Sequence, residues 1–176
     1  MILLDYGHGW DTPGKKWKDL EEWKFNRQVG DWLCLELDKR RIEYDILVPE
    51  DDDIGLRTRV ERAKQSPAKL LVSIHGNAFP KDTSVHGLEV FYYSSKGKKF
   101  AEILQRELVC ALGWRDRGVK KANFTIIKKT PQIAVLSENG FYTNDIQREK
   151  MLKPEIQYKI GWAHANAIEQ YIDLMQ

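Results

Sequence analysis

Apolar runs alternate with amphipathic segments along the first half of the chain. Residues 2–5 form a short apolar run that predicts a strand, and the glycine- and proline-containing stretch 7–18 predicts an irregular loop. A helix is expected to open at Glu21 and Glu22, because acidic residues suit the positive end of a helix dipole. The apolar positions that recur at helical spacing and predict its buried face are Phe25, Val29, Trp32, Leu33 and Leu37.

The same alternation continues to a strand that ends at a histidine. Residues 44–48 predict a second strand, and residues 54–65 predict a helix. Residues 69–74 are mostly apolar and partly β-branched, which predicts a buried central strand. His75 lies where this strand ends, because Gly76 follows it. The inward positions of the helix are expected to be Leu56, Val60 and Ala63.

Strands and helices also alternate in the second half. The expected elements are a strand over 88–93, an amphipathic helix over 97–112, a loop and short strand over 118–127, and a strand over 133–137. A short helix to Leu152 follows, with Asn144 or Asp145 as its cap, and Pro154 starts a last helix to about residue 175.

This order of elements predicts an α/β fold in a single domain over residues 1–176. Strands that alternate with helices favour a twisted, mostly parallel central sheet covered by helices on both faces. A chain of 176 residues is long enough for one domain with a full core. The sequence contains no internal repeat, linker or low-complexity segment.

Composition narrows the class of protein. Hydrophobic residues make up 42% of the chain, which excludes a disordered protein. A net charge of +2 gives no basis for a nucleic-acid partner, and no stretch reaches the roughly 18 apolar residues of a membrane span. Cys34 and Cys110 lie in helical patterns without CxxC spacing, so both are expected to be buried, reduced thiols. The expected assembly is a monomer.

The start of the chain bears on where the protein is made. No basic segment, long apolar run or small-residue cleavage site precedes the first strand. The chain as written is therefore expected to remain in the cytoplasm after synthesis, unless something else releases it.

Candidate chemistry lies at the ends of three predicted strands. His8, His75 and Glu138 each follow or end a buried strand. Ligands of open α/β sheets bind at the carboxyl ends of the strands, so we expect these three side chains to share a site. His8, Glu22 and His75 are residue types that bind zinc, and catalytic zinc sites use three protein ligands.

A carboxylate beside such a metal can work as an acid and a base. Glu138 is the candidate that accepts a proton from water and then delivers it to a leaving amine. The reaction class is metal-assisted hydrolysis of an amide. The ligands are far apart in the sequence, with no HExxH motif, so the pattern alone leaves a structural role open for each histidine.

Five sequence blocks occur in a fixed order along nearly the whole chain. The first block is Asp5-Tyr-Gly-His-Gly-Trp10, and the second is Glu22 with Asn26. The third consists of Leu56, Arg59 and Ala63, followed by Ser73-Ile-His-Gly-Asn-Ala78. The fourth is Gly87-Leu-Glu-Val-Phe-Tyr-Tyr93, and the fifth is Val135-Leu-Ser-Glu-Asn-Gly-Phe-Tyr-Thr-Asn144. In this order they resemble the blocks of the zinc-dependent N-acetylmuramoyl-L-alanine amidases, which are peptidoglycan hydrolases with an α/β fold. Tyr6 and Trp10 depart from the family's Pro and Gly, which affects the rim near His8 but removes no ligand.

The resemblance implies a role for each matching residue. His8, Glu22 and His75 would be ligands of Zn²⁺, Glu138 the catalytic glutamate, and Asn77 a supporting residue on the substrate side. The substrate would be peptidoglycan, cut between N-acetylmuramic acid and L-alanine.

The resemblance also suggests a biological setting and leaves rivals open. A compact amidase without a recognisable leader suits a phage-type endolysin that acts on the bacterial cell wall after release. One alternative is a zinc peptidase that cuts the stem peptide. The other is a wall-binding module without turnover, which the presence of all three ligands and Glu138 argues against.

Other conspicuous residues have plainer interpretations. His86 is expected in a loop and His164 in a structural position on the last helix. Arg59 is expected to form a salt bridge beneath the site, and Glu89 to be a solvated strand position.

Overall fold

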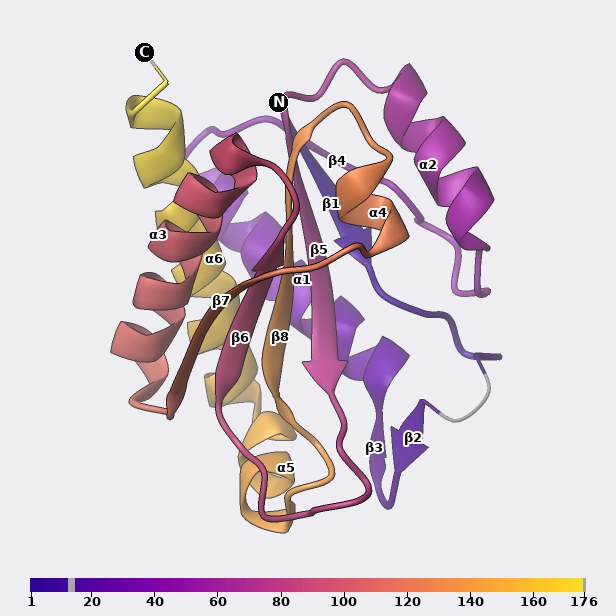
Figure 1. Ribbon diagram of the computed structural model, residues 1–176, viewed down its shortest axis with the longest axis vertical. Helices are drawn as coiled ribbons and strands as arrows, with labels where there is room; N and C mark the ends of the chain where they lie inside the picture. Colours follow the sequence, from indigo (N-terminus) through magenta and orange to yellow (C-terminus); the bar gives the residue numbers. More distant parts are fainter. Residues whose placement is uncertain (13–14, 176) are drawn as a thin grey trace.

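A six-stranded sheet with strand order β4-β1-β5-β8-β6-β7 runs through the middle of the molecule (Figure 1). This computed structural model describes residues 1–12 and 15–175. The strands are β1 (Ile2–Tyr6), β4 (Tyr44–Ile46), β5 (Leu70–Asn77), β6 (Leu88–Tyr92), β7 (Asp116–Lys121) and β8 (Ile133–Phe141). Neighbours are parallel except for β6 and β8, which pair antiparallel. The prediction of a mostly parallel α/β sheet is confirmed.

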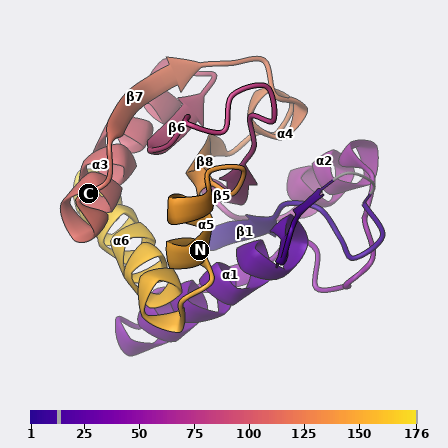
Figure 2. The ribbon, with the colours of Figure 1, turned by 90° about the horizontal axis from the view of Figure 1, so that it is seen from below.

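Helices cover both faces of this sheet (Figure 2). One face is covered by α1 (Glu22–Lys39), α3 (Ser95–Leu112) and α6 (Pro154–Asp173). The other face is covered by α2 (Leu56–Gln65) and the four-residue α4 (Thr125–Lys128), and α5 (Asp145–Met151) follows β8. The second face therefore has the smaller helical cover, and it leaves room for a site.

Two hydrophobic clusters form because side chains alternate along each strand. Leu4 of β1 and Val72 of β5 belong to the larger cluster, under α1, α3 and α6. Leu3, Leu71 and Leu136 belong to the smaller cluster, together with apolar residues of α2 and α4. The same alternation places the side chains of Asp5, His75 and Glu138 on the α2 and α4 side of the sheet.

The structure differs from the predictions in short elements. A two-stranded hairpin, β2 (Lys16–Trp17) and β3 (Leu20–Glu21), forms around the end of the predicted loop, and residues 13 and 14 of that loop lie outside the described residues. The predicted loop and short strand over 118–127 instead contain most of β7 and the start of α4. Elements of two to four residues are too short to show a hydrophobic period, so a pattern cannot reveal them.

Helix boundaries depend on local hydrogen bonds. Asn144 is confirmed as the cap of α5, since its side chain accepts a hydrogen bond from the Gln147 backbone N–H at 2.9 Å. The prediction that Leu56 faces inward is wrong: it is the first residue of α2, at the edge of the sheet, and is 54% exposed.

The remaining predictions on cysteines and membrane spans have mixed outcomes. Both cysteines are free, but Cys34 is only half-buried and Cys110, on α3, is exposed, so the prediction of two buried thiols is wrong for Cys110 and met only in part for Cys34. Within the part of the chain that the structure describes, no helix is long and apolar enough to cross a membrane.

Close packing of α1 against α6 gives a prediction about stability. A Cβ at Gly161 would lie 2.8 Å from the backbone nitrogen of Leu33, and neither helix can move without disturbing the core. Gly161→Ala is therefore expected to lower the free energy of unfolding by about 1–3 kcal/mol, although alanine is the better helix former. Lys159→Ala, at an exposed position of the same helix, is the control and should change it by less than about 0.5 kcal/mol. Urea denaturation measures both, and equal stability of the two variants would contradict the packing argument.

Candidate metal centre

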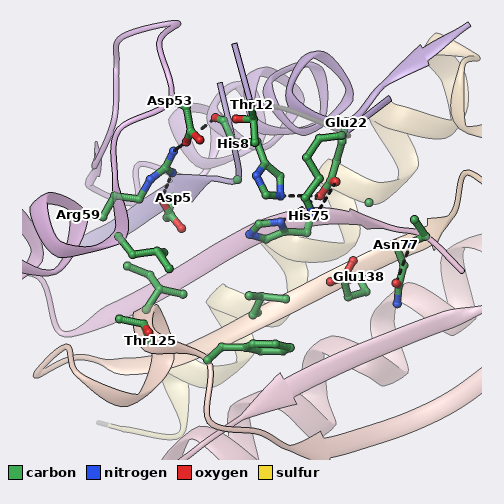
Figure 3. Close-up of a pocket in the computed structure, with 18 of the residues that line it drawn as sticks. Asp5, His8, Thr12, Glu22, Asp53, Arg59, His75, Asn77, Thr125 and Glu138 are labelled. Carbon is green, nitrogen blue, oxygen red and sulfur yellow. Dashed lines mark hydrogen bonds and ion pairs between the residues drawn. The ribbon is translucent and has the colours of Figure 1, made fainter. Parts of the chain in front are cut away.

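A pocket of about 590 Å³ opens where β1, β5 and β8 end, on the face of the sheet that α2 and α4 cover. Figure 3 shows His75 and Glu138 facing this pocket from neighbouring strands, with Thr125 of α4 on its far side. The strand ends meet here because the strands are parallel and in register. The sequence-based expectation of a shared site at this edge is therefore met by the arrangement of the sheet.

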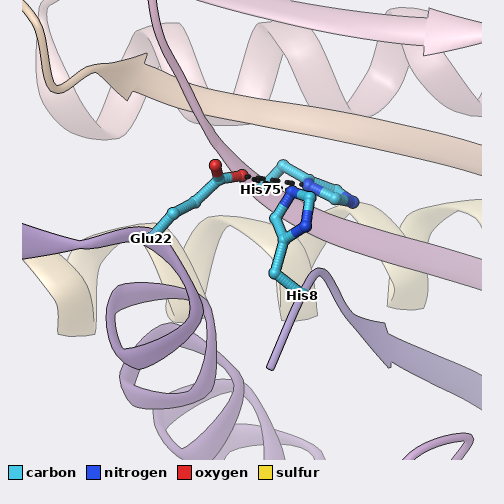
Figure 4. Close-up of side chains that lie close together, drawn as sticks. All are labelled: His8, Glu22 and His75. Atoms are coloured by element: carbon cyan, nitrogen blue, oxygen red, sulfur yellow. Dashed lines mark hydrogen bonds and ion pairs between the residues drawn. The ribbon is translucent and has the colours of Figure 1, made fainter. Parts of the chain in front are cut away.

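His8, Glu22 and His75 converge on one point (Figure 4). Oε1 of Glu22 lies 3.1 Å from Nδ1 of His75 and 3.3 Å from Nε2 of His8, and one ligand atom of each residue lies within 4.8 Å of the others. Two ligands at a tetrahedral zinc with bonds of about 2.0–2.1 Å are about 3.3 Å apart. The spacing and the mixed nitrogen and oxygen donors therefore fit a zinc ion.

Glu22 reaches this point because it begins α1. It follows the β2–β3 hairpin directly, and its side chain is 2% exposed. Asn26 lies one turn further along the same face of the helix and donates a hydrogen bond to the carbonyl of Gly7 at 2.9 Å. Glu21 instead points to solvent and pairs with Lys16. The hydrogen bond of Asn26 thus connects the first turn of α1 to the segment that follows β1.

The segment that carries His8 is held in an unusual backbone conformation. His8 has a φ of 65°, in the left-handed region that non-glycine residues seldom adopt. A Cβ at Gly7 would lie 2.0 Å from Cε1 of His75, and a Cβ at Gly9 would lie 2.1 Å from the backbone nitrogen of Asp53. Glycine is therefore required on both sides of His8 so that the histidine can approach its partners.

A buried ion pair supports this segment from below. Nη1 of Arg59 donates to Oδ1 of Asp5 and to the carbonyl of Tyr6, both at 2.7 Å, and Nη2 reaches the carbonyl of His8 at 3.4 Å. The second oxygen of Asp5 accepts a hydrogen bond from Ser73 at 2.6 Å. The expected salt bridge beneath the site is confirmed, and it links α2 and β5 to the residues that precede His8.

Glu138 faces the triad from the neighbouring strand. It is paired with His75 in the register of β5 and β8, and its Oε2 atom is buried without a hydrogen-bond partner among the described residues. Burial raises the pKa of Glu138 to about 8, and the charge of Glu22 adds to the rise while His75 opposes it. The carboxyl group can therefore hold a proton near neutral pH.

A hydrogen-bonded chain behind the sheet fixes the strand that carries Glu138. Nδ1 of His164 lies 2.8 Å from the carbonyl of Ile160, so this nitrogen is the donor and Nε2 accepts from Ser137 Oγ at 2.9 Å. Asn139 Nδ2 donates to Ser137 Oγ at 3.0 Å and to the carbonyl of His75 at 3.1 Å. Burial lowers the pKa of His164 to about 4, so it is neutral, in keeping with the structural position expected for it.

The charges within the triad favour an ionised Glu22. Burial alone would raise the pKa of Glu22, but hydrogen bonds from His75 and His8 outweigh it and lower the pKa well below the ordinary range. Burial would likewise lower the pKa of His75, and the contact with Glu22 reverses this and raises it. A carboxylate that stays ionised is a suitable metal ligand.

Tyr142 is a site residue that the sequence analysis missed. Its side chain is buried, and its hydroxyl donates to Oε2 of Glu22 at 3.1 Å, which leaves Oε1 to the two histidines. Tyr142 follows the last residue of β8, beyond a shift in the pairing of β5 and β8, so its spacing from Glu138 in the sequence did not indicate it.

The other expectations about single residues have different outcomes. Asn77 lines the pocket, and its Oδ1 accepts a hydrogen bond from the backbone of Ala78 at 2.8 Å. His86 is exposed in its loop. Glu89 is not solvated as expected: it is buried on an inner strand and pairs with Arg117 and Lys120 of β7.

Known proteins are similar to this chain in sequence and in fold. A family model described as N-acetylmuramoyl-L-alanine amidase matches residues 2–170. N-acetylmuramoyl-L-alanine amidase LytC of Bacillus subtilis (strain 168) is 31% identical over 97% of this chain, which spans 35% of LytC, and the endolysin of Bacillus phage SPP1 is 27% identical over 99% of this chain and 66% of its own length. The crystal structure of N-acetylmuramoyl-L-alanine amidase from Clostridium difficile 630 superimposes with a TM-score of 0.91 at 27% identity, over 98% of this chain and 96% of that one.

The ion pair beneath His8 can be tested through stability. Arg59→Met leaves the buried carboxylate of Asp5 without its cation, and such a loss costs about 3–5 kcal/mol of unfolding free energy. Arg57→Met is the matched control, because Arg57 is exposed on the same helix, and it should change stability by less than about 0.5 kcal/mol. Denaturant unfolding with and without metal measures both variants. If Arg59→Met were as stable as Arg57→Met, the ion pair would not support the site.

The raised pKa of Glu138 predicts how stability depends on pH. In the metal-free chain the folded state holds a proton on this carboxyl up to a pKa of about 8, whereas the ordinary value is 4.5. Its contribution to stability is therefore fully present below about pH 4.5 and is lost as the pH rises to about 8. Glu138→Gln removes this dependence, so the stability of the variant relative to wild type should increase from pH 5 to pH 8. Unfolding in the presence of a chelator measures the difference, and parallel pH curves would show that burial does not perturb Glu138.

Proposed function

The chain belongs to the N-acetylmuramoyl-L-alanine amidase family, and on that premise we propose that it is a zinc amidase in which His8, Glu22 and His75 hold the metal and Glu138 is the catalytic carboxylate. It is a peptidoglycan hydrolase that cuts the amide bond between N-acetylmuramic acid and L-alanine. The observation that carries the proposal is the convergence of three ligand atoms beside a carboxyl group, one buried oxygen of which has no hydrogen-bond partner in the described part of the chain.

The choice of zinc rests on the donor set. Two imidazole nitrogens and one carboxylate oxygen are typical of catalytic zinc sites, in which the fourth position stays open. Zinc held by this triad would supply a Lewis acid that polarises an amide carbonyl and makes water a nucleophile at neutral pH. Tyr142 contributes by binding the outer oxygen of Glu22, so that the inner oxygen keeps its place between the histidines.

Glu138 would move the proton that hydrolysis requires. As a carboxylate it accepts a proton from the attacking water, and as a carboxylic acid it delivers this proton to the nitrogen of the leaving L-alanine. The position beside His75 brings it to the same pocket as the triad, and one of its oxygens is available because Oε2 has no hydrogen-bond partner in residues 1–12 and 15–175. Asn77, at the pocket wall, is proposed to contact the substrate.

The setting of the enzyme follows from the same proposal. We propose that residues 1–176 make up one catalytic domain that acts as a monomer, because a single chain supplies the whole triad and Glu138. Its target would be the bacterial cell wall, in the manner of the endolysin to which it is similar.

Digestion of purified cell walls tests the two roles separately. Glu138→Ala is expected to bind about one zinc per chain, as the wild type does, but to release L-alanine amino termini at least about 10²-fold more slowly. His75→Ala is expected to lose both zinc and activity, because two ligands do not suffice. His86→Ala is the control, since this exposed histidine lies outside the triad, and it should keep both.

The products separate the amidase from its rivals. Amidase action gives a new lactyl carboxylate and a free L-alanine amino group, whereas cleavage of the stem peptide gives amino groups of other residues. A wild type that binds zinc but releases neither product would be a wall-binding module. Wild-type activity that survives thorough removal of metal, or a Glu138→Ala variant as active as the wild type, would refute the proposed roles.

A further inference from the structure

The pocket is larger than the metal centre needs, and its second part has a different chemistry. This part, here called the apolar limb, is lined by Ile54, Leu56, Phe124, Ile126 and Leu136. Leu136 lies two residues before Glu138 on the same face of β8, so the Cα atoms of these two residues are about 7 Å apart. This distance is about the size of one sugar ring. A group bonded directly to the scissile amide can therefore reach into the limb.

An aromatic ring and two small polar side chains form the rim of the apolar limb. Phe124 is 42% exposed, although it lies in the pocket wall, and the ring of Phe91 packs edge-on against it with centroids 5.1 Å apart. Asn123 and Thr125, on either side of Phe124, also line the pocket. Phe124 precedes α4 and makes no side-chain cap for it, so its ring is not needed to start the helix. The ring is thus held in place with one side free for a ligand.

The charges of the pocket are unevenly distributed. At the apolar limb Arg59 is buried and bound to Asp5, while Asp53 remains partly exposed. At the metal end Lys15 lines the pocket, is 42% exposed, and lies 3.8 Å from Oε2 of Glu22. A carboxylate-bearing ligand is therefore attracted to the Lys15 end, and none of the described residues that line the apolar limb offers it a free cation.

We propose that the apolar limb is a saccharide subsite, which sets the direction of the substrate in the pocket: the glycan lies over Phe124 and the stem peptide runs past Lys15. This inference rests on the proposed function. The C–H face of a sugar ring packs well on an aromatic ring, and its hydroxyl and acetamido groups can hydrogen-bond to Asn123 and Thr125. The stem peptide carries carboxylates, at least at its C-terminus, and these fit the end that holds Lys15.

The test compares two substrates that share the scissile bond. One is a disaccharide peptide, and the other is the same peptide acylated by D-lactate alone, which lacks the sugar. Wild type should have the higher kcat/KM for the disaccharide peptide. In Phe124→Ala the ratio of the two kcat/KM values should fall about tenfold, and Phe124→Trp should restore it. Phe79→Ala is the matched control, because Phe79 is 44% exposed and does not line the pocket, and its ratio should equal that of wild type.

A binding measurement keeps the subsite separate from the chemistry. Titration of the free disaccharide into wild type and Phe124→Ala, followed by NMR, should show weaker binding to the variant. An unchanged kcat/KM ratio, or an equal loss on both substrates, would overturn the subsite. If wild type cut neither substrate, the proposed function would fail, and the titration alone would decide whether the limb binds a saccharide.

The role of the Lys15 end is tested with the same enzyme and a second pair of substrates. Wild type should prefer a stem peptide with free carboxylates over one whose carboxylates are amidated. Lys15→Met should abolish this preference and leave the saccharide ratio unchanged. A Lys15→Met variant that kept the preference would show that the peptide does not run past Lys15, and would overturn the proposed direction.

Discussion

The parallel pairing of β1, β5 and β8 is the constraint on which the rest of the structure depends. The register of these strands pairs His75 with Glu138, and it pairs Asp5 with Ser73 close by. Because side chains alternate, a slip of one residue in this pairing would send each of them to the opposite face. The hydrogen bonds of Asn139 to the carbonyl of His75 and to Ser137 add side-chain support where the register shifts after His75.

The charges around the pocket are balanced by contacts rather than by solvent. Glu22 is ionised because two imidazoles and Tyr142 surround its carboxylate, and Arg59 and Ser73 bind the two oxygens of Asp5. Glu138 is the exception, since burial raises its pKa and one of its oxygens has no hydrogen-bond partner among the residues that the structure describes. The group with the least support is thus the one proposed to exchange a proton.

Backbone strain and exposed apolar side chains lie at the pocket, where the function is proposed. His8 has a left-handed backbone between two glycines that cannot carry a Cβ, and Leu56 and Phe124 remain exposed at the pocket although they are large and apolar. Each of these features reduces stability when it is considered alone, and the fold tolerates them because two hydrophobic clusters hold the sheet from both sides. The pocket stays open because α2 and α4 cover less of their face of the sheet than the three long helices cover of the other.

The sequence alone determined the α/β class and the order of the long elements, because long periodic segments are local properties of the chain, and its motif blocks predicted the four residues that are proposed for the site. Only the tertiary structure decided which of these side chains are buried, paired or exposed: Glu89 is covered by β7, Tyr142 binds Glu22, and Leu56 stays exposed at the start of α2. These outcomes depend on contacts between residues far apart in the chain. The hairpin β2–β3 and α4 escaped prediction for another reason, since elements of two to four residues have no measurable period.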